Sequence, residues 1–278
     1  RSRRQRQMCI RDRINTMKSH NTHYGLVTGA AGLLGVEHCK SILDINNGLV
    51  MVDINKVELL KTYNFLKKIY PNASIIKCLT DITSEKEVKI LSKLLNKKNI
   101  FIRTLINNAC IDPKPKKIIS KKNLILKTWN KELDVGLKGS YHLIEYFAQN
   151  MKKKKDGCII NIASDLSVVA PNQSIYKKSF KNFTKPVTYS VIKHGLIGMT
   201  KYYASLFAEY NITCNAVSPV GVFNNQRKSF INELIKLIPM KRMAHKSDIK
   251  NTIDFLINKK QKFITGQNII IDGGRTII

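Results

Sequence analysis

The stretch Thr28-Gly29-Ala30-Ala31-Gly32-Leu33-Leu34-Gly35 decides the expected fold. It follows an apolar run at residues 24–28 and leads into a segment with helical spacing at residues 32–46. The first glycine permits a tight turn, the second lets the backbone approach a phosphate, and the third lets the helix pack closely on the strand. The start of the helix also offers free N–H groups and a partial positive charge. The stretch therefore predicts a cradle for a pyrophosphate group.

Two kinds of segment alternate along the rest of the chain. Short apolar runs, typical of buried strands, lie at residues 24–28, 48–54, 73–79, 101–107, 157–163, 212–217 and 268–271. Segments with helical spacing lie at residues 32–46, 56–70, 84–96, 126–153, 187–210, 227–238 and 247–258. Apolar strands with little alternation, separated by helices, indicate a parallel sheet covered on both faces. With right-handed crossovers, the pattern predicts an α/β fold with one doubly wound, mostly parallel, Rossmann-like sheet in a single domain.

An acid stands at the end of the second strand-like run. Asp53 lies near the spacing, about 20 residues after the first glycine, at which a carboxylate binds the ribose hydroxyls of a dinucleotide. A carboxylate there repels the 2′-phosphate of NADP, so NAD is the expected cofactor and NADP the less favoured one. The alternative is that Asp53 is an ordinary turn residue at a strand end. Strand, glycines, helix and acid together favour the dinucleotide interpretation.

Composition sets limits on the class of protein. The chain has 278 residues, of which 43% are hydrophobic, and this suits one large α/β domain. No apolar run approaches the ~18 residues of a membrane-spanning helix, so we expect no membrane partner. The six cysteines are scattered and include no Cys-x-x-Cys pair. They predict reduced thiols in a cytoplasmic protein, with neither disulfides nor a metal site.

The net charge of +29 has two interpretations. It could mark binding to nucleic acid or another acidic surface, or it could reflect a lysine-rich surface. Six of the ten arginines fall within the first 13 residues, and the rest of the chain relies on lysine. Bidentate contacts to bases usually need arginine, so we disfavour a nucleic-acid partner. We expect residues 1–16 to be a basic leader that is disordered or not native, followed by one domain at 17–278.

A second motif carries chemistry. Tyr189 and Lys193 are four residues apart in a helical segment, so their side chains share one face. A neighbouring ammonium stabilises a phenolate and lowers the pKa of a tyrosine from its usual value near ~10, which lets the phenol exchange a proton with a substrate oxygen. Ser164 ends a strand at the edge where ligands bind, and its hydroxyl can hold that oxygen. The alternative is a chance Tyr-x-x-x-Lys spacing with Ser164 as an ordinary helix cap.

At these positions the chain resembles the short-chain dehydrogenase/reductase family over residues 24–275. The matching strings, in the order of the family, are Thr28–Gly35, Asp81-Ile82, Asn107-Asn108-Ala109, Ile160-Asn161-Ile162-Ala163-Ser164, Tyr189 with Lys193, Asn215-Ala216-Val217-Ser218-Pro219, and Gly266-Gln267 to Asp272-Gly273-Gly274. The resemblance implies an enzyme, an NAD(H)-dependent oxidoreductase. Such an enzyme transfers a hydride between nicotinamide and a carbonyl or alcohol.

The resemblance also implies roles for individual residues. Tyr189 would be the general acid/base, Lys193 would tune it and bind the nicotinamide ribose, and Ser164 would orient the substrate oxygen. Asp81 would contact adenine, and Asn108 would support the cofactor-side strand. The implied cofactor-binding set is Gly29, Gly32, Leu33, Leu34, Gly35, Asp53, Asp81, Ile82, Asn108, Ala109, Tyr189, Lys193, Pro219 and Val222. No metal is expected.

Several positions depart from the pattern of the family. The Gly-x-x-Gly-x-x-Gly spacing is more common in the sugar-nucleotide epimerase branch, so one alternative is an epimerase or dehydratase that retains its NAD. Cys110 and Val220 stand where glycine is usual. Gly136 stands where an asparagine usually holds a water of the proton relay. A second alternative is therefore a non-catalytic cofactor- or nucleic-acid-binding protein on the same scaffold.

The segment between Ser164 and Tyr189 is about twice the usual length in the family. The insertion near residues 171–187 is polar and basic, and we expect a surface loop or lid there, beside the substrate mouth. The strings at 163–173 and 238–243 are similar to bacterial members linked to surface-polysaccharide and flagellin-sugar modification, which implies a sugar or sugar-nucleotide substrate. The family also implies a homo-oligomer, a dimer or tetramer formed through the two long helices.

Overall fold

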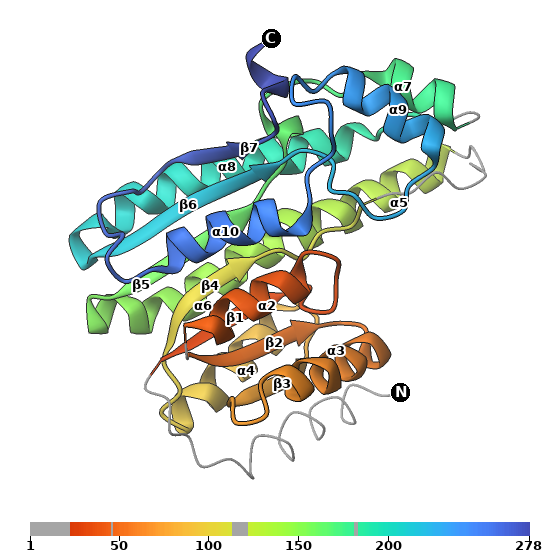
Figure 1. Ribbon diagram of the computed structural model, residues 1–278. Coiled ribbons are helices and arrows are strands. Elements are labelled where there is room, and N and C mark those ends of the chain that lie inside the picture. Colours follow the sequence, from red (N-terminus) through yellow and green to blue (C-terminus); the bar gives the residue numbers. More distant parts are fainter. Residues whose placement is uncertain (1–22, 46, 113–121, 181–182) are drawn as a thin grey trace.

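A single parallel sheet organises the molecule (Figure 1). The computed structural model describes residues 23–45, 47–112, 122–180 and 183–278. Within these residues seven strands pair in the order β3-β2-β1-β4-β5-β6-β7, and every pair is parallel. The strands are β1 Tyr24–Thr28, β2 Gly48–Asp53, β3 Ile75–Leu79, β4 Ile102–Asn107, β5 Gly157–Ile162, β6 Ile212–Pro219 and β7 Asn268–Ile271. The predicted doubly wound parallel sheet is confirmed.

Helices cover both faces of this sheet. They are α2 Gly35–Asp44, α3 Lys56–Ile69, α4 Glu85–Lys97, α5 Lys122–Leu133, α6 Gly139–Lys154, α7 Gln173–Ser179, α8 Val187–Phe207, α9 Lys228–Lys236 and α10 Lys246–Ile257. Apolar residues of α4, α6 and α8 pack on one face of the sheet, and those of α2, α3 and α10 pack on the other. Because both faces are covered, the central strands are buried along their whole length, which explains why apolar residues predominate in them without strict alternation.

Helix ends follow from local chemistry. The side chain of Ser84 accepts a hydrogen bond from the backbone N–H of Glu87, as its position before α4 predicts. Lys155 ends α6 in the left-handed conformation, after three lysines in the last turn. Those lysines oppose the carbonyl end of the helix dipole, so this basic run is explained by its place on a helix end.

Two predicted segments differ from the structure. The helix expected at 126–153 is two helices, α5 and α6, joined by the π-helical turn η1 at Asp134–Lys138. The loop or lid expected near residues 171–187 contains the helix α7. Asn172 caps this helix, and Ile175 within it is buried. The cap and the buried apolar side chain help to order a short helix within a polar, basic sequence.

The order of the strands places a crevice at one edge of the sheet. The chain runs outward from β1 through β2 to β3, then returns to β4 on the other side of β1. The loops that follow β1 and β4 therefore diverge, one to each face of the sheet. Such a switch point, at the carboxyl ends of the strands, is where open α/β sheets bind ligands.

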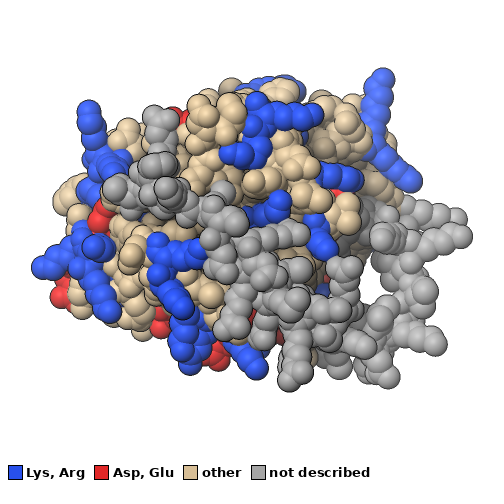
Figure 2. Space-filling model, turned by 90° about the horizontal axis from the view of Figure 1, so that it is seen from below, with Lys and Arg blue, Asp and Glu red and all other residues tan. Residues whose placement is uncertain are grey.

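The charged surface is lysine-rich. Figure 2 shows Lys and Arg side chains spread over one face, with uncharged atoms between them. This spread fits the lysine-rich surface that the composition suggests. Among the described residues, no helix combines the length and apolar character needed to cross a membrane. The basic leader predicted at residues 1–16 lies outside the described residues.

Candidate active site

A cleft of about 970 Å³ opens at the carboxyl ends of the strands. Every residue of the predicted site except Gly35 lines this cleft. The glycine-rich loop, the second-strand acid and the catalytic pair, which are far apart in the sequence, therefore meet in one place. Gly35 lies behind the loop, where it is buried.

The glycine-rich loop has the geometry of a phosphate cradle. Gly29 has a φ of +59°, a conformation that favours glycine, and a Cβ on it would lie 3.0 Å from the Cα of Ala109. A Cβ on Gly35 would lie 2.0 Å from the carbonyl oxygen of Gly29. The first turn of α2 has no side-chain cap at Leu34, so no capping side chain occupies the start of this helix, where a ligand could bind. The residues present fit the pyrophosphate of a dinucleotide.

The loop is braced from the neighbouring strand. Asn108, just after β4, donates from Nδ2 to the carbonyl oxygens of Thr28 and Gly29, at 3.0 and 3.2 Å. In return, the hydroxyl oxygen of Thr28 accepts from the backbone N–H groups of Asn108 and Ala109, at 3.0 and 3.1 Å. These four bonds fix the relative position of the loops that follow β1 and β4, the two sides of the crevice.

Two carboxylates, one at the end of strand β2 and one after β3, also line the cleft. Asp53 accepts the backbone N–H of Ala31 at 3.0 Å and that of Asn55 at 2.9 Å, so it is held against the glycine-rich loop. Asp81 accepts from the backbone N–H and hydroxyl of Thr83, at 3.0 and 2.7 Å. Each acid is held in place by hydrogen bonds to the backbone, and each lines the cleft.

The side chains predicted to be catalytic converge on the end of β5. Lys193 is buried and donates from Nζ to the carbonyl oxygen of Ile162 at 2.8 Å. Its ammonium lies 5.5 Å from the centre of the Tyr189 ring. Ser164 and Tyr189 both line the same cleft. Phenol, ammonium and hydroxyl thus gather at one wall of the cleft, which supports the chemical interpretation of the spacing over chance.

The position of α8 is fixed by a chain of buried polar side chains. Asn107 at the end of β4 donates to Asn161 on β5 at 2.8 Å, and Asn161 donates to the hydroxyl of Thr200 on α8 at 2.9 Å. Buried hydrogen bonds of this kind have directional requirements that apolar contacts lack. They orient the helix that carries Tyr189 and Lys193 relative to the strand that carries Ser164.

The surroundings of Tyr189 raise the pKa of its phenol. Burial is the largest cause, and the negative charge of Asp112 and the thiol of Cys110 add to it, whereas the hydrogen bond with Ser164 acts in the opposite sense. The phenol is therefore protonated in the free protein at neutral pH. A nearby positive charge has to stabilise the phenolate if Tyr189 is to accept a proton.

Close packing against α8 explains why glycine stands at position 136. A Cβ at this position would lie 2.4 Å from Cγ2 of Ile192 on α8. Gly136 lies in the π-helical turn, and its carbonyl oxygen accepts the hydroxyl of Ser140 at 3.0 Å. The close approach of η1 and α8 leaves no room for an asparagine side chain without a shift of Ile192.

Two ion pairs at the site escaped the sequence analysis. Asp165, buried next to Ser164, accepts the Ser164 hydroxyl at 2.7 Å and pairs with Arg275 near the end of the chain. Lys185 in the insertion pairs with Asp112 after β4. All four residues line the cleft. The partners lie 110 and 73 residues apart in the sequence, so no local spacing could have revealed them.

Aromatic side chains from the insertion and from α9 form the outer wall of the cleft. The rings of Tyr176 and Phe180 lie 5.4 and 5.6 Å from that of Phe230 on α9, measured between centres. The guanidinium of Arg227 lies 5.3 Å from the ring centre of Phe180. The helix α7 therefore packs onto α9 through tilted ring contacts, and the insertion forms part of the wall of the cleft.

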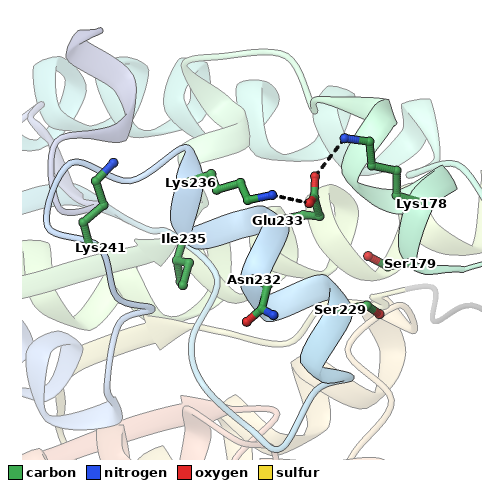
Figure 3. Close-up of a pocket in the computed structure, with 8 residues that line it drawn as sticks. All are labelled: Lys178, Ser179, Ser229, Asn232, Glu233, Ile235, Lys236 and Lys241. Carbon is green, nitrogen blue, oxygen red and sulfur yellow. Dashed lines mark hydrogen bonds and ion pairs between the residues drawn. The ribbon is translucent and has the colours of Figure 1, made fainter.

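A second, open pocket of about 620 Å³ lies on the outside of this helix pair. Figure 3 shows Lys178 of α7 and Lys236 of α9 both directed at Glu233, with distances of 3.1 and 2.6 Å. Glu233 offsets part of the charge of these lysines, and all three side chains belong to a surface ion-pair network. Exposed networks of this kind contribute little to stability.

The described residues include no group of three or more side chains suited to a metal ion. The five described cysteines are free thiols, and four of them are buried. Burial raises the pKa of Cys78 to about 12, so that thiol stays protonated and unreactive.

Comparison with known proteins assigns the family. A family model described as enoyl-(acyl carrier protein) reductase matches residues 29–276, nearly the whole described chain. The chain belongs to the short-chain dehydrogenase/reductase family. It is accordingly a nicotinamide-dependent oxidoreductase, as the resemblance implied.

Relatives of this short-chain dehydrogenase/reductase carry several names. A 3-oxoacyl-[acyl-carrier-protein] reductase FabG of Staphylococcus epidermidis is 30% identical over 203 residues, 70% of this chain and 75% of the relative. A post-translational flagellin modification protein A of Campylobacter coli is 28% identical over 89% of this chain and 96% of its own. A short chain dehydrogenase of Leptospira borgpetersenii, solved with bound NAD+, has a TM-score of 0.78 at 29% identity and covers 94% of this chain and 96% of its own.

Proposed function

We propose that the enzyme uses NAD(H) to interconvert an alcohol and a carbonyl of a small molecule, with Tyr189 as general acid/base. The observation that carries this proposal is the convergence of Ser164, Tyr189 and Lys193 on one wall of the cleft that also contains the glycine-rich loop. The bound nicotinamide supplies or accepts the hydride. The protein binds and orients the two reactants and moves one proton.

Each side chain has a distinct task in this proposal. The phenol of Tyr189 gives its proton to the substrate oxygen in reduction and takes it back in oxidation. The ammonium of Lys193, which donates to the carbonyl oxygen of Ile162, would stabilise the phenolate form and would bind the ribose of the nicotinamide when the cofactor is present. Ser164 donates its hydroxyl proton to Asp165, so its oxygen can accept a hydrogen bond from a substrate hydroxyl. Asp81, Ile82, Asn108, Pro219 and Val222 are proposed to contact the cofactor.

We propose NAD rather than NADP because Asp53 stands beside the cradle. Asp53→Asn keeps the shape of the side chain and removes its charge. We expect the preference for NAD over NADP, measured as the ratio of kcat/KM values, to fall by about tenfold, since one charge repulsion of roughly 1.4 kcal/mol is lost. The control is Glu209→Gln, a neutralised acid in the turn after α8, which should keep the wild-type ratio. An unchanged ratio in Asp53→Asn would assign cofactor choice to other residues.

We propose a sugar or sugar nucleotide as the substrate. The relative named for flagellin modification supports this class, as does an outer wall that combines aromatic rings with cations. Arg227 and Lys131 line the cleft without an acidic partner among the described residues, so they favour an anionic substrate. The test is a turnover screen of the purified enzyme, with NAD and NADP, against sugar, sugar-nucleotide and simple alcohol panels. Turnover of simple alcohols alone would contradict the proposal.

We propose a dimer or tetramer formed through α6 and α8. Val187, Val191, Tyr202 and Leu206 form an exposed apolar stripe along α8, and Tyr141 is exposed on α6. Tyr202→Glu places a charge in the middle of this stripe. We expect sedimentation velocity to show an oligomer for the wild type and a shift toward monomer for the variant. A monomeric wild type would contradict the proposal.

The single domain at 17–278 and the cytoplasmic location of the protein stay predictions.

A further inference from the structure

A second lysine lies against the catalytic tyrosine. The ammonium of Lys185 lies 3.8 Å from the centre of the Tyr189 ring, whereas that of Lys193 lies 5.5 Å from it. Lys185 precedes Tyr189 by four residues, and Lys193 follows it by four. The phenol therefore has a cation on each side along the chain, and only the second belongs to the motif.

Lys185 is held in this position from several sides. Its side chain is only 9% exposed and pairs with the carboxylate of Asp112, which follows β4. Its backbone is fixed by Gln173 at the start of α7. Gln173 Oε1 accepts the N–H of Lys185 at 2.9 Å, and Gln173 Nε2 donates to its carbonyl oxygen at 3.0 Å. A long, flexible lysine side chain loses rotamer freedom when it is fixed in this way, so its position is specified by the fold.

We propose that Lys185 is a positioning residue that supports the phenolate of Tyr189 electrostatically, in addition to Lys193. The proposal rests on the proposed role of Tyr189 as general acid/base. A cation over an aromatic face is attracted to the ring, and the attraction grows when the ring carries a negative charge. The insertion would thus supply a second cation to a site where Gly136 cannot provide the usual relay side chain.

Charged and polar groups from several elements face Tyr189, and the sign of each charge decides whether its removal raises or lowers the pKa of this tyrosine. Lys185 comes from the insertion, Lys193 from α8 itself, Asp112 and Cys110 from the segment after β4, Ser164 from the end of β5, and Tyr176 from α7. A cation favours the phenolate and lowers the pKa of Tyr189, whereas an anion favours the phenol and raises it. Removal of Lys185 should therefore raise this pKa, and removal of the Asp112 charge should lower it.

Because these two substitutions should shift the pKa of Tyr189 in opposite directions, they distinguish electrostatic support by Lys185 from a purely mechanical role. If Lys185 only ties the insertion to the segment after β4, then Lys185→Met and Asp112→Asn break the same link and should change the enzyme in the same direction. If Lys185 acts through its charge, the two variants shift the pH dependence in opposite directions. The ion pair itself therefore provides the discriminating experiment.

The test is the pH profile of kcat/KM for alcohol oxidation, in which activity rises as Tyr189 loses its proton. We expect Lys185→Met to move the limb of this profile assigned to Tyr189 to higher pH by about one unit, which is about a tenfold loss on the acidic side of the limb. Lys185→Arg should restore the wild-type limb, and Asp112→Asn should move it to lower pH. The matched control is Lys178→Met, an exposed lysine of the same insertion that is directed at Glu233 (Figure 3).

Each outcome of this experiment either supports or contradicts the proposed role of Lys185. Opposite shifts in Lys185→Met and Asp112→Asn, with rescue by arginine, support it. A loss in Lys185→Met that is equal at every pH, or a shift in the same direction in both variants, overturns it. Tyr189→Phe is measured in parallel. If this variant stays active, Tyr189 is not the general acid/base and the proposed function fails. If it loses activity, a negative result for Lys185 contradicts only the role proposed for Lys185.

Discussion

Tyr189→Phe should reduce turnover by about 10²- to 10⁴-fold while leaving NADH binding close to that of the wild type. The substitution removes one hydroxyl and keeps the ring, so the cation contacts of Lys185 and Lys193 and the packing of α8 persist. Only the group that exchanges a proton with the substrate oxygen is lost. The measurements are steady-state turnover with the best substrate of the screen and titration of NADH fluorescence.

Tyr63→Phe is the control for this experiment. Tyr63 lies on α3, where its ring contacts Lys77, and it does not line the cleft. The control should keep wild-type turnover. Undiminished turnover in Tyr189→Phe would rule out its role as general acid/base, and loss of NADH binding would show that the hydroxyl acts on the cofactor instead.

Gly35→Ala should abolish NADH binding and lower the free energy of unfolding by about 3 kcal/mol. A Cβ at this position would meet the carbonyl oxygen of Gly29 at 2.0 Å and the Cα of Ala30 at 2.9 Å. Both are backbone atoms of the cradle, so the clash cannot be relieved by rotation of a side chain. Overpacking of this kind costs stability and forces a backbone shift, and here the shift falls on the loop that holds the pyrophosphate.

Gly198→Ala provides a matched control. Gly198 lies inside α8, and a Cβ on it would meet no atom within 4 Å. Alanine is favoured over glycine inside a helix by about 1 kcal/mol, so this variant should be slightly more stable and bind NADH normally. Denaturant unfolding and fluorescence titration measure both quantities. Normal NADH binding in Gly35→Ala would contradict the cradle.

The fold could be predicted because its signals are local. A buried parallel strand is rich in apolar residues, as Gly157–Ile162 is, and a helix start is favoured by a cap such as Ser84. The glycine-rich loop is local in part, because the positive φ of Gly29 and the contact of Gly35 with the carbonyl oxygen of Gly29 concern atoms a few residues apart. Asp53 could be placed for the same reason, since it ends the strand next to β1.

The parts that escaped prediction depend on contacts between distant segments. The glycine at position 136 in the π-helical turn is required by the approach of Ile192 on another helix. The anchoring of Ser164 by Asp165 and Arg275 needs the end of the chain to return to β5. No pattern within a short window encodes such pairs, so the motif identified the reacting groups while their supporting residues emerged only from the structure.

The central claim is that Ser164, Tyr189 and Lys193 surround the reacting end of a bound dinucleotide. The most direct test is a crystal structure of the enzyme with NAD. We predict the pyrophosphate at the first turn of α2, the adenosine ribose beside Asp53, and the nicotinamide against Tyr189 and Lys193. A dinucleotide bound elsewhere, or one whose nicotinamide lies out of reach of Tyr189, would contradict the account.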